Sequence, residues 1–252
     1  MKIPKGLRLD LHKHSSFSME EIGDGLVPLV ITSPLYFPES LINRLSQPIN
    51  NDHDEIVEEI CSYARNLFPV FVEIERVLCP GGHLVIQTRD VRICEALIAV
   101  ESIHREMVEQ TGLFLISRYL WLSNFKRAAR QNLLEKLKKE LGPIPPDPEV
   151  FLVFQKPGNS YLGEPLKEDE EFLSKNFMTT ATGKLKSRHP YQAPLPVLQS
   201  FVRTYSRPLD IILDPFAGCG TTAMAALKNN RHAVLYEIDP AAIEMIENNF
   251  RE

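Results

Sequence analysis

A glycine turn between an apolar strand and a helix limits the possible folds of this sequence more than any other segment. Ile211-Ile-Leu213 predicts a short buried strand, and Asp214-Pro-Phe-Ala-Gly-Cys-Gly-Thr-Thr222 follows it directly. Helical spacing then runs through 221–229, and a second strand is predicted at 233–236. A strand, a glycine turn, a helix and a second strand form the nucleotide-binding unit of doubly wound α/β folds.

The residues of this turn are those of a cofactor site. Gly218 and Gly220 permit positive φ and leave room for a ligand against the backbone. Glu237 follows the second strand, where a carboxylate can accept hydrogen bonds from ribose hydroxyls. No lysine follows the glycines as it does in a phosphate-binding loop, so a nucleoside cofactor without a triphosphate is favoured, and S-adenosylmethionine fits that description. The alternative interpretation is a tight turn used only for packing.

Strands alternate with helices along the rest of the chain, which predicts a mostly parallel, doubly wound α/β sheet covered on both faces. Hydrophobic periodicity places the further strands at 7–11, 26–31, 83–88, 113–121 and 150–154. It places the helices at 54–78, 92–110, 124–141, 196–205 and from 240 onwards. We expect a single domain over 1–252, with a basic helical insertion at 123–149 and a loop-rich insertion at 157–187 as candidate DNA-recognition elements.

A second polar turn, Thr32-Ser-Pro-Leu-Tyr-Phe-Pro38, begins where the strand at 26–31 ends. Ligands of open α/β sheets bind at this edge. The amino nitrogen of cytosine or adenine is a weak nucleophile because its lone pair is delocalised into the ring. The Ser33 hydroxyl and the Pro34 carbonyl are candidate acceptors that would localise that pair, and Tyr36 offers a face for stacking of a flipped base. The alternative is a surface turn with a packed aromatic side chain.

Together these motifs resemble those of amino-group DNA methyltransferases. Thr32-Ser-Pro-Leu-Tyr36 resembles the Ser-Pro-Pro-Tyr catalytic motif, and 214–222 resembles the cofactor motif. The segment 76–86 is similar to the helix–turn–strand segment of the family, and 188–196 is similar to an element that encloses the methionine end of the cofactor. Because the catalytic motif precedes the cofactor motif, the resemblance is to the circularly permuted beta class, with a Rossmann-like methyltransferase fold.

The resemblance implies methyl transfer from S-adenosylmethionine to an amino group of a flipped base in double-stranded DNA. Serine in the first motif position favours N4 of cytosine over N6 of adenine. The implied catalytic residues are Ser33, Pro34 and Tyr36. The implied cofactor-binding residues are Asp10, His189, Asp214, Phe216, Gly218, Cys219, Gly220, Thr221 and Glu237.

Two residues depart from the family pattern and keep other functions open. Leu35 replaces the second proline of the catalytic motif, and Cys219 replaces the usual serine between the glycines. Leucine lacks the φ restraint that proline would impose at this position. One alternative is therefore a weakly active pseudo-methyltransferase that serves as a binding subunit. An RNA or protein methyltransferase is the other.

The net charge and the cysteine spacing limit how the protein can bind DNA and metal ions. The net charge of −5 means that DNA contact requires a local basic patch. The four cysteines form no Cys-x-x-Cys pair, so we expect reduced thiols and no bound metal. No apolar run of membrane-spanning length and no secretory signal is found, which predicts a cytoplasmic protein, for which a homodimer remains open. The candidate DNA-binding residues are Lys126, Arg127, Arg130, Lys138, Lys184, Lys186 and Arg188.

Overall fold

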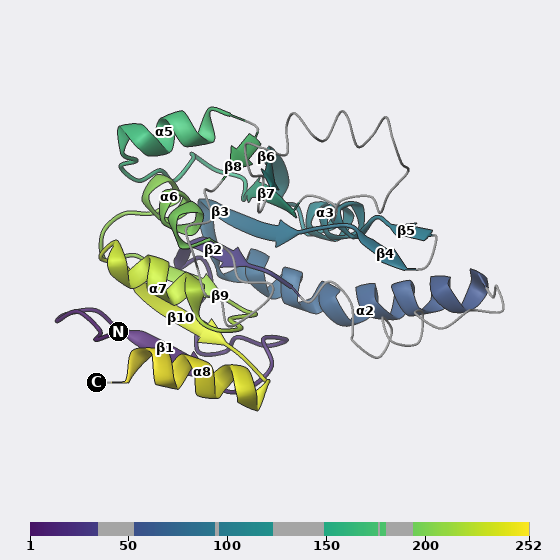
Figure 1. Ribbon diagram of the computed structural model, residues 1–252, viewed down its shortest axis with the longest axis horizontal. Helices are drawn as coiled ribbons and strands as arrows, with labels where there is room; N and C mark the ends of the chain where they lie inside the picture. The colour runs from purple at the N-terminus through teal and green to yellow at the C-terminus, as the bar shows by residue number, and fades with distance from the viewer. Residues whose placement is uncertain (35–52, 94–95, 123–148, 176, 180–193, 252) are drawn as a thin grey trace, which may run out of the picture.

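The computed structural model describes residues 1–34, 53–93, 96–122, 149–175, 177–179 and 194–251, and within them a large mixed sheet (Figure 1). The strands are β1 (Leu9–His12), β2 (Val27–Thr32), β3 (Leu78–Thr88), β6 (Phe114–Leu122), β7 (Glu149–Gln155), β8 (Phe177–Thr179), β9 (Ile211–Asp214) and β10 (His232–Tyr236). Their order across the sheet is β1-β10-β9-β2-β3-β7-β6-β8. Strand β7 is antiparallel to both of its neighbours, and the other pairs are parallel.

Helices cover both faces of this sheet. On one face pack α6 (Leu195–Tyr205), α7 (Thr221–Lys228) and α8 (Pro240–Phe250), and on the other α2 (His53–Val77) and α3 (Val100–Gln110). Strand residues alternate between the two cores: Leu29 and Ile31 of β2 join the first, whereas Val30 joins the second. The predicted doubly wound, mostly parallel α/β fold is confirmed.

The prediction of one long helix over 92–110 is wrong. The segment begins with a two-stranded antiparallel hairpin, β4 (Val91–Ile93) and β5 (Ala96–Ile98), and α3 starts only at Val100. The side chain of Asp90 accepts a hydrogen bond from the Glu101 backbone N–H at 3.1 Å, so a residue before the hairpin satisfies a donor in the first turn of the helix. By contrast, α2 runs through Pro69 as one helix.

Part of the predicted loop-rich insertion is also regular structure. It contains α5 (Lys167–Leu173) and β8, which pairs parallel with β6 at the sheet edge. The buried Asp169 carboxylate receives two hydrogen bonds from the Arg203 guanidinium, at 2.6 and 2.5 Å, and one from Ser200 at 2.7 Å. These contacts attach α5 to α6, so the Asp169 carboxylate serves packing within the domain.

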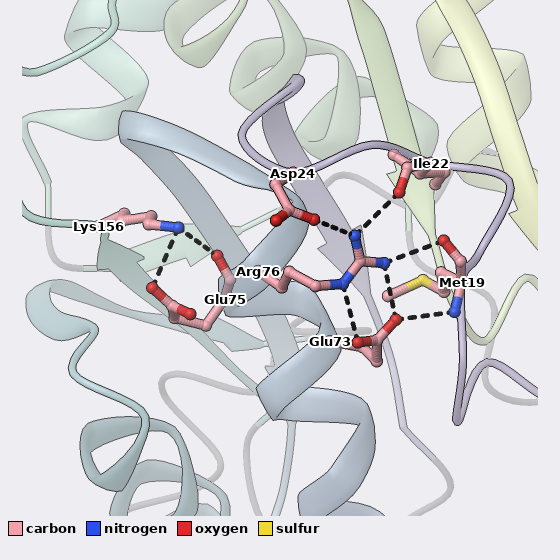
Figure 2. A network of polar contacts seen from close by, with 7 residues as sticks. All are labelled: Met19, Ile22, Asp24, Glu73, Glu75, Arg76 and Lys156. Carbon is pink, nitrogen blue, oxygen red and sulfur yellow. Dashed lines mark hydrogen bonds and ion pairs between the residues drawn. The ribbon is translucent and has the colours of Figure 1, made fainter.

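Arg76, near the end of α2, holds the segment that connects β1 to β2 (Figure 2). Its guanidinium donates to the Met19 and Ile22 carbonyls, both at 3.0 Å, and to the Asp24 carboxylate at 2.6 Å. Glu73 completes the network by pairing with Arg76 and accepting from the Met19 backbone N–H. A segment without regular structure is thereby fixed against the helix beneath it.

None of the helices in the described part of the chain is long and apolar enough to cross a membrane.

Candidate active site

The two polar turns meet at the carboxyl edge of the sheet. Strand β2 pairs directly with β9, so that Leu29 lies opposite Ile212 and Val30 opposite Leu213. Where the strands end, the Thr32 hydroxyl donates a hydrogen bond to Asp214 Oδ1 at 2.9 Å. Both residues are buried, at 2% and 4% exposure. The segments that carry Ser33 and the glycine turn are therefore joined by a side-chain contact shielded from water.

Asp214 is the buried carboxylate at the centre of this arrangement. It also accepts from the Phe216 backbone N–H at 3.1 Å and from the Thr222 hydroxyl. Burial raises the pKa of its carboxyl to about 6, and the hydrogen bonds from Thr222, Phe216 and Thr32 offset only part of that rise. Asp214 thus supports the glycine turn from inside the protein.

We expect an Asp214→Asn variant to gain stability relative to the parent as the pH rises. The folded pKa of Asp214, about 6, lies above its ordinary value of 3.8, so its contribution to stability is greatest below that value and is lost as the pH rises through 6. Between pH 4.5 and 7.5 the difference in unfolding free energy should shift by about 2 kcal/mol in favour of the variant. Urea unfolding at several pH values measures it, and a difference that does not change with pH would contradict the assignment.

Glu237 is also attached to the glycine turn. Its Oε2 accepts from the Gly218 backbone N–H at 2.7 Å, and its Oε1 accepts from the N–H groups of Ile238 and Asp239 at 2.8 and 2.9 Å. The carboxylate directly follows β10 and orients both the turn and the approach to α8. These bonds use both acceptor sites of Oε1 and one of Oε2, so Oε2 retains one site for a further donor.

The two glycines of the turn have different surroundings. Gly218 has φ +53°, and a Cβ placed on it would meet no atom of the described residues within 4 Å, its chain neighbours apart. Gly220 has φ +82°, and a Cβ there would lie 3.2 Å from Ile246 and Phe250 of α8. Packing thus accounts for Gly220, whereas the space beside Gly218 is open. Space for a ligand directly against the backbone is therefore found at Gly218, whereas the Cβ position of Gly220 faces α8.

Three further predicted cofactor residues, Phe216, Cys219 and Thr221, lie in or directly after this turn. Phe216 packs against the core on the α2 face, Thr221 is the buried first residue of α7, and Cys219 Sγ lies 3.3 Å from the Thr221 hydroxyl. Asp10, the next-to-last residue of the strand predicted at 7–11, is exposed and lies inside β1, opposite Val234. The strand continues to His12 because its pairing with β10 extends that far.

The structure also places the catalytic candidates that it describes. Ser33 is half-buried and directly follows β2, and Pro34 is buried behind it. Three residues of the predicted active site lie outside the described residues: Leu35, Tyr36 and His189. The same holds for the basic candidates for DNA binding, which are Lys126, Arg127, Arg130, Lys138, Lys184, Lys186 and Arg188.

Sequence reasoning missed Thr32 and Thr222 as partners of Asp214. Their position beside the two motifs is visible in the sequence, but hydroxyl residues at strand ends and helix starts are common in many contexts. The pairing of β2 with β9 brings Thr32 to the Asp214 carboxylate, and the fold of the glycine turn into α7 brings Thr222 to it.

Comparison with known proteins gives a consistent assignment. A family model described as DNA methylase, for N6 and N4 enzymes, matches residues 27–248. The type II methyltransferase M.MjaI of Methanocaldococcus jannaschii is 29% identical over 272 aligned residues, which cover 91% of this chain and 86% of the relative.

Solved structures share the fold. The cytosine-N4-specific PvuII DNA methyltransferase superimposes with a TM-score of 0.75 at 17% identity, covering 97% of this chain and 87% of the other. The crystal structure of the M1.HpyAVI–SAM complex gives a TM-score of 0.63 at 17% identity, covering 96% and 100%.

Proposed function

The chain belongs to the DNA methylase family that modifies the amino groups of bases, and we propose that its target atom is the exocyclic N4 of cytosine. It is an S-adenosylmethionine-dependent amino-group DNA methyltransferase. The choice of cytosine rests on Ser33, because serine occupies the first position of the segment that resembles the Ser-Pro-Pro-Tyr catalytic motif. Ser33 also lies next to the buried Thr32–Asp214 contact.

Ser33 and Pro34 are the proposed acceptors for the two hydrogens of the target amino group. Drawing these hydrogens towards the Ser33 hydroxyl and the Pro34 carbonyl localises the nitrogen lone pair for attack on a methyl carbon. The methylated nitrogen carries a positive charge and then loses one hydrogen as a proton to water. Tyr36 is proposed to stack on the base once it has left the duplex.

The glycine turn fits S-adenosylmethionine. When bound, this cofactor supplies a methyl group on a positively charged sulfur, and the sulfur becomes a neutral thioether once the methyl group is transferred. The open space beside Gly218 admits a ligand against the backbone, and Glu237 at the end of β10 retains acceptor capacity for ribose hydroxyls. We assign the residues around the turn to the cofactor site, together with Asp10 at the adenine and His189 at the methionine end. They are Asp214, Phe216, Gly218, Cys219, Gly220, Thr221 and Glu237.

Replacing Glu237 with alanine is expected to weaken cofactor binding by about 1.5–3 kcal/mol, because a charged acceptor is lost at the ribose. The variant also releases the Gly218 N–H, so Glu237→Gln, which keeps one acceptor oxygen, is the matched control and should lose less. Titration calorimetry with S-adenosylmethionine measures both. Equal affinity of the alanine variant and the parent would place the ribose elsewhere.

The basic insertion at 123–149 is the proposed DNA-contacting element of this acidic protein, with Lys184, Lys186 and Arg188 as a second patch. Each phosphate contact should add about 0.9 to the slope of the logarithm of the binding constant against the logarithm of salt concentration. A double-stranded partner is proposed because the target base must be extruded from the stack.

The target base is tested by mass spectrometry of nucleosides from DNA of cells that express the chain. N4-methylcytosine is the expected product, and N6-methyladenine would overturn the choice of cytosine while retaining the family chemistry. Radiolabelled methyl transfer to duplex DNA, RNA and protein, measured side by side, tests the substrate class. Cofactor binding without transfer to any of them would identify a pseudo-methyltransferase.

A further inference from the structure

Three metal-ligating side chains converge at the carboxyl end of β1, at a place where the sequence predicts no metal. His12 is the last residue of that strand, and His14 and Glu21 come from the segment that follows. His14 Nε2 lies 2.9 Å from Glu21 Oε1, and His12 Nδ1 lies 3.6 Å from the same oxygen. The three ligand atoms all lie within 4.8 Å of one another. Two ligands of one zinc ion, each about 2.1 Å from it, lie about 3–3.5 Å apart. The two distances to Glu21 Oε1 are close to this spacing, and a small movement of the imidazoles would bring all three ligand atoms onto one ion.

The hydrogen-bond pattern of His14 requires a proton or a metal ion between its Nε2 and Glu21 Oε1. Its Nδ1 lies 3.1 Å from the Ser15 carbonyl oxygen, which can only accept, so Nδ1 carries the ring hydrogen. In a neutral imidazole the lone pair of Nε2 then points at Glu21 Oε1, which is also an acceptor. Two acceptors at 2.9 Å repel each other unless a proton or a metal ion lies between them.

The surrounding residues orient these ligands as the outer shell of a metal site does. The Tyr236 hydroxyl donates to Glu21 Oε2 at 2.9 Å, which leaves Oε1 directed at the two imidazoles. His12 stacks on the Tyr236 ring at a centroid distance of 4.6 Å and an interplanar angle of 22°. The Ser15 carbonyl fixes the His14 ring, and Arg76 fixes the Met19 and Ile22 carbonyls on both sides of Glu21.

We propose that His12, His14 and Glu21 form a binding site for a divalent transition-metal ion such as Zn²⁺. Two imidazoles and one carboxylate suit zinc, nickel or cobalt better than magnesium or calcium, which prefer oxygen ligands. The His14 and Glu21 side chains are 49% and 40% exposed, so water completes the coordination. The site adjoins the proposed cofactor edge, because the Glu237 backbone N–H donates to the His12 carbonyl at 3.1 Å.

The test is calorimetric titration of the tag-free full chain with Zn²⁺, without cofactor or DNA. Its result is therefore independent of the proposed methyl transfer. A Cys61→Ser background removes an exposed thiol, which is a competing ligand. We expect one zinc ion per chain and at least about a 10-fold loss of affinity in His14→Ala and in Glu21→Gln. The matched control is Glu20→Gln, a carboxylate on the same segment that lies outside the cluster.

Tyr236→Phe, which removes only the hydroxyl that orients Glu21, should weaken zinc binding while circular dichroism stays unchanged. Substitution with Co²⁺ should give visible absorption that is lost in His14→Ala. Absence of zinc binding, or binding that His14→Ala and Glu21→Gln leave unchanged in folded protein, would overturn the site. An equal loss in Glu20→Gln would do the same, because it would indicate general attraction of cations to acidic groups.

Discussion

Replacing Gly218 with valine is expected to lower the affinity for S-adenosylmethionine about 100-fold or more while the protein remains folded. A side chain at this position would enter the open space that the proposed cofactor occupies. Within the described part of the chain, its Cβ would displace no atom beyond its chain neighbours within 4 Å. The left-handed φ of +53° costs a branched residue about 1–2 kcal/mol, which a folded domain can tolerate. Calorimetric titration with the cofactor and a thermal melt measure the two quantities separately.

Gly220→Val is the control for Gly218→Val, because the closer packing around Gly220 predicts a loss of stability as well as of cofactor affinity. A Cβ at Gly220 would lie 3.2 Å from Ile246 and Phe250, so stability should fall together with cofactor binding. Overpacking of about 1–3 kcal/mol would add to the cost of positive φ. Gly218→Ala and Gly220→Ala repeat the comparison with the smallest possible side chain. A folded Gly218→Val protein with parental affinity would remove the turn from the cofactor site.

The unit of β9, α7 and β10 could be predicted from sequence because its signals are local. Apolar residues mark the strands, two glycines mark the turn, and helical spacing begins at once after it. Glu237 was identified because it directly follows a predicted strand. Its bond to Gly218 could not be predicted, since it depends on the parallel pairing of β9 and β10.

Local sequence patterns could not predict features that depend on residues distant in the chain. The start of α3 depends on Asp90, which lies across a hairpin from the helix that it caps. The acidic segment around Asp169 looked like a polar loop because its partner Arg203 lies on another helix. The cluster at His14 was missed for a similar reason: Glu21 is brought to it by Tyr236, which lies near the other end of the chain.

Replacing Ser33 with alanine is expected to lower turnover about 100-fold or more while changing cofactor affinity little. The hydroxyl is proposed to accept a hydrogen from the target amino group, an interaction that matters most when the nitrogen lone pair is localised for attack. Single-turnover methyl transfer to duplex DNA measures the rate, and calorimetric titration measures cofactor affinity. A comparable loss in both quantities would give Ser33 a structural role instead.

Thr32→Val separates contact with the base from support of the turn. Valine has a similar shape to threonine but lacks the hydroxyl that donates to Asp214 at 2.9 Å. Loss of that buried hydrogen bond should cost about 1–3 kcal/mol of stability, because the Asp214 carboxylate loses a donor. If Ser33 acts on the base and Thr32 only positions it, Ser33→Ala should lose rate with a smaller loss of stability than Thr32→Val. Thr32→Val should lose stability as well as rate. Identical profiles for the two variants would mean that the catalytic turn acts as one structural element and that Ser33 has no separate chemical role.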